Sequence, residues 1–231
     1  KKAKEFWQKR RPLAVMIENH AESRPPSGLS RADVVYEAVA EGGITRYMGL
    51  FYCGAAAKAM MIAPVRSSRI YFITWAQEYG ERPIYMHVGG ANNICPTCSG
   101  GVKPSGMVST KVMAIEYLGA LGWRKAQSND FDTTFDLGAP VFIRNPDRLD
   151  HEVATEHTMM AFLDEAWKVA EKRNLGAKDS EGIFWDKNFV PWKFMKDNPT
   201  KEGSVVSIKF GFWDKTPDYD VEWKYDLKTN S

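Results

Sequence analysis

Residues 12–46 read PLAVMIENHAESRPPSGLSRADVVYEAVAEGGITR, and this polar stretch around short apolar runs decides the fold. The five-residue apolar run Leu13–Ile17 is typical of a buried strand. Residues 24–28, Arg-Pro-Pro-Ser-Gly, cannot continue a strand or a helix, because proline fixes φ and has no backbone N–H. We therefore expect a loop after the first strand and a polar site built at the ends of sheet strands.

A hairpin is predicted directly after this loop. Strand-like runs over 34–40 and 44–53 flank Glu41-Gly42-Gly43, with aromatic and β-branched residues on both sides. Ser30 as an N-cap makes a helix over 31–41 the alternative. On a hairpin, Glu41 and Arg46 face each other across the turn. They would form a cross-strand ion pair, or Glu41 would be held near other arginines for acid/base work or sugar binding.

The rest of the chain alternates helix and strand signals and then ends in strands. We expect helices from Ser67 or Ser68 to about Tyr79, from Ser109 or Thr110 to about Ala120, and from Thr155 to Gly176. We expect further strands at 84–88, 141–144, 205–212 and 221–225, a long loop at 91–108 and a solvated acidic loop at 127–139. This order predicts an α/β (α+β) fold, a layered sandwich of a mixed β-sheet with helices, plus the start of a second, smaller α/β part.

Two domains follow from this order. We place an N-terminal domain at 1–176. Residues 177–231 are predicted to be a linker and the first strands of a C-terminal domain whose remaining strands lie outside this sequence.

Composition is that of an ordinary globular protein, with 44% hydrophobic and 26% charged residues and a net charge of +2 over 231 residues. This charge gives no bulk attraction to polyanions, so we expect no nucleic-acid partner. The sequence has no run of about 18 apolar residues, so we expect membrane attachment only through an anchor outside this chain.

The motif PVRSSR at 64–69 places Arg66 and Arg69 at the start of a predicted helix. Free N–H groups and the positive end of a helix dipole, together with two guanidinium groups, favour a carboxylate or phosphate ligand. The alternative is internal ion pairing of both arginines with Glu37, Glu41 or Glu78.

Three histidines are candidates for a general base or a ligand donor, or else are structural. His20 follows the first strand, and His87 lies in the 84–88 strand before a glycine pair. His157 lies in the predicted first turn of the long helix, where the dipole keeps it neutral. The predicted ligand-binding residues are His20, Arg24, Glu41, Arg46, Arg66, Ser67, Arg69, His87 and His157.

Neither the cysteines nor the short sequence motifs identify a catalytic or metal-binding chemistry. Cys95-Pro96-Thr97-Cys98 is a lone CxxC in a polar loop, which leaves a disulfide, free thiols, and metal or redox chemistry open. Cys53 ends an apolar run and is predicted to be buried. The sequence has no G-x-S-x-G elbow, no G-x-G-x-x-G and no EF-hand pattern around its acidic loop. We predict no metal and no cofactor, and we assign no catalytic residue.

The stretch from Arg11 to Gly90, with PLAVMIENHAESRPPSGLSRADVVYEAVAEGGITRYMGLF, APVRSSRIYFITWAQEY and IYMHVGG in that order, resembles the YerB-like family of bacterial lipoproteins. A weaker match continues at 142–144 and at His157, where the neighbouring residues depart from the family's Pro-His-Asn pattern. The resemblance implies a layered α/β sandwich, export, and a lipidated cysteine upstream of this chain. It implies no established activity. Export also strengthens the disulfide interpretation of Cys95 and Cys98.

We therefore expect an extracytoplasmic cell-envelope protein, anchored to the cell membrane, that binds an anionic cell-wall fragment or a membrane-bound envelope protein. One alternative is a hydrolase or transferase acting on a cell-wall polymer, with Glu41 as acid/base. The other alternative is a non-catalytic scaffold for a cell-wall synthase.

Overall fold

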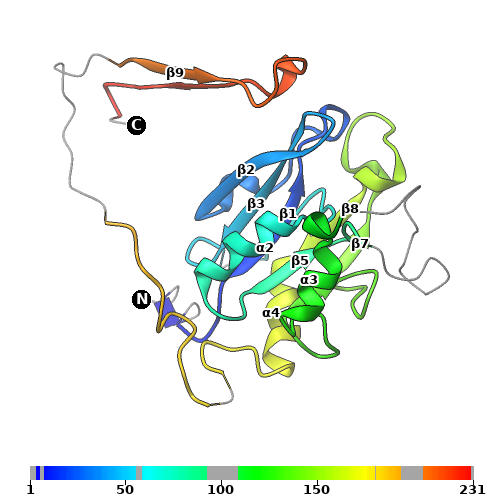
Figure 1. The fold of residues 1–231 in the computed structure, drawn as a ribbon, viewed down its shortest axis with the longest axis vertical. Helices are drawn as coiled ribbons and strands as arrows, with labels where there is room; N and C mark the ends of the chain where they lie inside the picture. The colour runs from blue at the N-terminus through cyan, green and yellow to red at the C-terminus, as the bar shows by residue number, and fades with distance from the viewer. Residues whose placement is uncertain are drawn as a thin grey trace.

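A mixed five-stranded sheet forms the centre of the structure, which is a computed structural model (Figure 1). The structure describes residues 4–5, 8–55, 59–92, 109–179, 181–193 and 205–229. The strand order is β2-β3-β1-β5-β6. The strands are β1 (Leu13–Glu18), β2 (Val34–Glu41), β3 (Ile44–Phe51), β5 (Ile84–His87) and β6 (Asp130–Asp132). β1 pairs antiparallel with β3 and parallel with β5, and β5 pairs parallel with β6.

The first five residues of β1 form an unbroken apolar run because both faces of the sheet are covered there. On one face, Ala14 and Met16 pack against the helices α2 (Ile70–Ala76) and α3 (Ala114–Ala120), which lie in front of the sheet in Figure 1. On the other face, the odd-numbered residues of β1 pack against a second sheet and the helix α4 (Leu163–Lys172). These layers confirm the predicted α+β sandwich.

The second sheet has the order β4-β8-β7 and is antiparallel. Its strands are β4 (Met61–Ile62), β7 (Phe142–Arg144) and β8 (Met159–Phe162). The helix predicted from Thr155 was wrong over its first part. Residues 155–157 form a 3₁₀ turn and 159–162 are the central strand of this sheet, so sheet pairing on both sides overrode the helical spacing of the apolar residues.

α4 begins only at Leu163, where Asp164 and Glu165 suit the positive end of the helix dipole. Its buried stripe is Leu163, Ala166, Trp167 and Ala170.

The predictions for the hairpin and for the start of α2 had different outcomes. The hairpin of β2 and β3 around Gly42-Gly43 is present, and the helical alternative over 31–41 is wrong. Arg69, rather than either serine, occupies the N-cap position of α2, with no side-chain cap bond, because the Ser68 hydroxyl bonds to Tyr85.

The predicted acidic loop contains the fully buried strand β6. Cys53, predicted to be buried, is exposed, because the chain turns away from the sheet after Phe51. Short 3₁₀ turns occupy 21–23, 29–31, 77–79, 110–112, 146–148, 155–157 and 217–219.

The last described segment forms a separate two-stranded sheet of β9 (Ser207–Phe210) and β10 (Val221–Lys224), drawn orange to red in Figure 1. It contacts the tip of the β2–β3 hairpin, where the Thr216 hydroxyl donates to the Gly43 carbonyl at 3.3 Å. The division at 176/177 stays a prediction. Among the described residues, no helix has the length and apolar character needed to cross a membrane.

Candidate functional site

The candidate site lies at the carboxyl ends of β1 and β5. These parallel strands are paired only as far as Val15 and Met86, and then they separate. Residues 63–68 fill the gap, since the Arg66 amide donates to the Met16 carbonyl and the Val88 amide donates to the Arg66 carbonyl. Such strand ends are where open α/β sheets commonly bind ligands.

Arg46 and Arg69 share a single carboxylate, Glu41. Arg46, on β3, places its Nη2 3.1 Å from Glu41 Oε1, and Arg69 places its Nη2 2.6 Å from Glu41 Oε2. Further bonds run from Arg46 Nη1 to the Ser67 carbonyl at 2.9 Å and from Arg69 Nη1 to the Ser68 carbonyl at 2.7 Å. The predicted ion pair of Glu41 with Arg46 is therefore present, but the two residues do not face each other across the turn, because the register places Arg46 opposite Ala38 and Glu41 opposite Ile44.

Burial differs sharply within this group. The Arg46 side chain is 3% exposed, whereas that of Glu41 is 50% exposed. Among the described residues, the Arg46 Nε has no hydrogen-bond partner. Burial, together with the charges of Arg69 and Arg66, lowers the pKa of Arg46 to about 10, although Glu41 opposes the shift. The guanidinium is therefore still charged at neutral pH and is short of negative partners.

The carboxylate of Glu41 is ionised in this setting. Burial alone would raise the pKa of Glu41, but the charges of Arg46 and Arg69 outweigh burial and lower it. A carboxyl group with a lowered pKa is a poor general acid and a weak base. Glu41 is therefore suited to holding the arginines and unsuited to proton transfer.

Arg66 points to a second carboxylate that the sequence did not single out. Its Nε lies 2.8 Å from Glu18 Oε1, and its Nη2 lies 3.4 Å from the exposed Glu156. The other oxygen of Glu18 lies 2.6 Å from Nδ1 of His157. Glu18 is the last residue of β1 and is buried. A carboxylate at the end of a buried apolar strand is unusual, and this position in the sequence could have indicated that Glu18 belongs to the site.

His20 and His157 are brought together although they are distant in the sequence. Their rings stack with centroids 4.9 Å apart and an angle of 21° between the planes. Glu22 joins them, with its Oε2 3.8 Å from Nε2 of His157. One potential ligand atom from each of these three residues lies within 4.8 Å of the others, which is the single cluster in the described part of the chain with metal-ligand spacing.

Arg24 lies in a different network. Its Nε donates to the Asn19 side chain at 2.9 Å, and its guanidinium stacks 4.8 Å from the Tyr219 ring centroid in the C-terminal hairpin segment. The Asn19 amide in turn donates to Thr45 and Glu37. Arg24 thus links the strand ends to residues 205–229.

His87 lies in the core of the sheet, fully buried between two aspartates. Its Nε2 is 2.6 Å from Asp130 Oδ1, and its Nδ1 is 2.8 Å from the Gly89 carbonyl. Arg124 donates to both Asp130 and Asp132, at 3.0 and 2.9 Å. Burial alone would lower the pKa of His87, but the two aspartates and the Gly89 carbonyl raise it. Because both ring nitrogens face acceptors, the imidazole is charged and is engaged in holding β5 and β6.

The structure thus brings together Glu41, Arg46, Arg66 and Arg69, and Glu18 links Arg66 to His157. Ser67 contributes its carbonyl. Arg24 and His87 contact other groups, and Cys95 and Cys98 lie outside the described residues.

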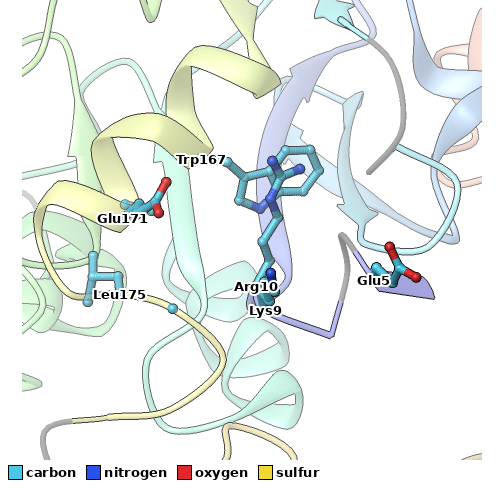
Figure 2. Close-up of a pocket in the computed structure, with 8 residues that line it drawn as sticks. Glu5, Lys9, Arg10, Trp167, Glu171 and Leu175 are labelled. Atoms are coloured by element: carbon cyan, nitrogen blue, oxygen red, sulfur yellow. The ribbon is translucent and has the colours of Figure 1, made fainter. Parts of the chain in front are cut away.

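A pocket of about 290 Å³ lies elsewhere, at the amino end of β1 (Figure 2). In Figure 2, Arg10 lies against the Trp167 ring, 4.7 Å from its centroid, with Glu171 and Leu175 of the α4 region beside it. Glu5 and Lys9 complete a lining of mixed charge. The length of β1 separates this pocket from the arginines, and its mixed charges favour no ligand class.

Comparison with known proteins gives three findings. Residues 1–175 match the model of a family described as "Protein of unknown function (DUF3048) N-terminal domain". A Bacillus subtilis (strain 168) protein named "Putative lipoprotein YerB" is 36% identical over 115 residues, which are 50% of this chain and 31% of that protein. The crystal structure of the YerB protein from Bacillus subtilis matches with a TM-score of 0.50 and 28% identity, over 73% of this chain and 46% of that one. This chain therefore spans less than half of either relative.

Proposed function

Since the chain belongs to the DUF3048 family, as its predicted YerB-like resemblance implied, we propose that it is an exported, membrane-anchored lipoprotein domain that binds an anionic ligand. The relative's name carries the proposal of an anchor and an extracytoplasmic location. Neither the family description nor that name states an activity. The ligand proposal therefore rests on the site itself.

The observation that carries the proposal is the sharing of one half-exposed carboxylate by Arg46 and Arg69. Two guanidinium groups can hold a planar carboxylate or a phosphate with several charge-assisted bonds. Glu41 supplies such a carboxylate from within the chain, and its exposure lets it move aside. An external anion would take its place on the Nη2 atoms of Arg46 and Arg69.

The proposed ligand class is a carboxylate-bearing or phosphate-bearing fragment of the cell wall. An exported protein meets such groups on glycan and peptide chains. A membrane-bound envelope protein with an exposed acidic segment offers the same chemistry and is the second source of ligand.

The enzyme and scaffold alternatives are less well supported. A hydrolase that used Glu41 as its acid would need a raised pKa, and the pKa of Glu41 is lowered. A pure scaffold would use the arginines only to hold the fold. The half-exposed Glu41 carboxylate, shared by two arginines, favours a ligand over a purely structural role.

The test compares Arg69→Ala with Arg31→Ala, an exposed arginine in the 29–31 turn. Calorimetric titration uses N-acetylmuramic acid, a muramyl dipeptide and inorganic phosphate in turn. Loss of a hydrogen-bonded charge costs about 1.5–3 kcal/mol, so Arg69→Ala should weaken binding about 10- to 150-fold, and Arg31→Ala should not. Binding that is unchanged in Arg69→Ala, with a lowered melting temperature, would instead support the scaffold.

A further inference from the structure

We propose that His20, Glu22 and His157 form a binding site for a divalent transition-metal ion of the zinc type. Two imidazole nitrogens and one carboxylate oxygen are the donor set of zinc sites that keep an open coordination position. Imidazole donors also favour zinc, cobalt and nickel over magnesium and calcium, which prefer oxygen. This proposal is independent of the anion site.

The spacing of the three ligands fits such an ion with a small adjustment. Metal–ligand distances of about 2.0–2.2 Å in a tetrahedral site place the ligand atoms about 3.4 Å apart. Nε2 of His157 and Oε2 of Glu22 are already 3.8 Å apart, and all three ligand atoms lie within 4.8 Å. The Glu22 side chain is 64% exposed, so it is free to close the remaining distance.

His157 is held in the orientation that a metal ligand needs. Its Nδ1 lies 2.6 Å from Glu18 Oε2, so Nδ1 is engaged by that carboxylate and Nε2 is the nitrogen that faces the proposed ion. A carboxylate behind a ligating histidine is the usual second partner of zinc-bound imidazoles. Glu18 is itself held by Arg66 at 2.8 Å, and both Glu18 and His157 are buried. This half of the site is therefore rigid before any ion binds.

The fold supplies the other two ligands from a single turn. His20 directly follows the end of β1, and Glu22 lies in the 21–23 turn that begins there. The Glu22 amide donates to Nδ1 of His20 at 3.3 Å, a long bond that a metal ion can replace. The stacked imidazole rings keep His20 beside His157. Rigid His157 and the adjustable pair of His20 and Glu22 together make a site that can close around an ion.

Cobalt(II) absorption, followed by displacement with zinc, tests the proposal on the whole chain. We expect one equivalent of cobalt with d–d bands and without a sulfur-to-cobalt charge-transfer band. His20→Ala and Glu22→Gln should each weaken cobalt binding at least about 10-fold while the melting temperature stays near that of the parent. Glu18→Gln should weaken it about 10- to 100-fold through loss of the partner of His157.

Two control variants distinguish this site from other chelating groups. His151→Ala removes an exposed histidine that bonds Asp150 and the Glu22 carbonyl, and it should leave cobalt binding unchanged. Replacing Cys95 and Cys98 together by serine should also leave it unchanged. Binding that survives in both His20→Ala and Glu22→Gln, or that is lost in the double cysteine variant, would overturn the proposal.

Discussion

Asp130→Asn is expected to destabilise the fold more than any single surface change. In the folded protein, Asp130 accepts the Nε2–H of His87 at 2.6 Å and one N–H of Arg124 at 3.0 Å. His87, Asp130 and Asp132 are fully buried. The substitution leaves two cations facing the single charge of Asp132, and a buried charge without its partner is costly.

The magnitude follows from this burial. Breaking a buried ion pair by removing one partner costs about 3–5 kcal/mol. For a chain of this size, each kcal/mol lowers the melting temperature by about 2–4 °C, so the expected fall is about 6–20 °C. Calorimetry or a circular-dichroism melt measures it. The matched control is Asp150→Asn, which removes the exposed partner of His151 and should leave the melting temperature unchanged.

The same variant should change the pH dependence of stability. The pKa of His87 in the folded protein is raised above its ordinary 6.5. Its charged form therefore stabilises the fold fully below pH 6.5, and that contribution is lost as the pH rises through the folded-state pKa. Without Asp130 the loss moves to lower pH. If Asp130→Asn melts as Asp150→Asn does, and the pH profile is unchanged, the buried charge network does not stabilise β5 and β6.

Four further predictions concern the rest of the chain. Arg11→Met should lower the free energy of unfolding in urea by at least about 1–3 kcal/mol, since the buried guanidinium donates to the carbonyls of Gly176, Arg82 and Lys178. Gly28→Ala should cost more than about 1 kcal/mol in the same assay, because φ is +78° and a Cβ would lie 2.5 Å from the Met61 carbonyl oxygen. Cys53 should react with a thiol reagent in the folded protein, slowly at neutral pH because partial burial and Asp33 raise the pKa of its thiol. Thiol titration of the unfolded, unreduced chain should find one free thiol if the Cys95–Cys98 disulfide forms, and three if it does not.

The sequence predicted those parts of the fold whose signals are local. The apolar run of β1 and the glycine pair between β2 and β3 each lie within a few residues of the structure that they specify. The ion pair of Glu41 with Arg46 was predicted from the hairpin turn, although Arg46 lies opposite Ala38 and not opposite Glu41. Local periodicity was misleading at 159–162, where two neighbouring strands turned helix-like spacing into a strand.

The sequence-based predictions failed mainly for charged residues that are buried against partners distant in the sequence. Asp130 and Asp132 were predicted to be solvated, because carboxylates are rarely buried without a charged partner. Their partners, His87 and Arg124, are known only from the structure. Glu18 and His157 were likewise missed as a pair, since they are 139 residues apart in the sequence. Contacts between residues so far apart leave no periodic signal in the sequence. The arginines of the candidate site could therefore be predicted, but not which residues they contact.

The affinity of Glu41→Gln for an anion shows whether Glu41 occupies a ligand site on Arg46 and Arg69. If Glu41 occupies the place of the ligand on Arg46 and Arg69, removing its charge removes an internal competitor. The two ion pairs of the half-exposed Glu41, at about 0.2–1 kcal/mol each, total about 0.4–2 kcal/mol, so the dissociation constant should fall about 2- to 30-fold. Calorimetric titration of parent and variant with the muramyl dipeptide measures this change. Glu41→Gln should bind the anion more tightly than the parent, and unchanged or weaker binding would show that Glu41 does not compete with a ligand for Arg46 and Arg69.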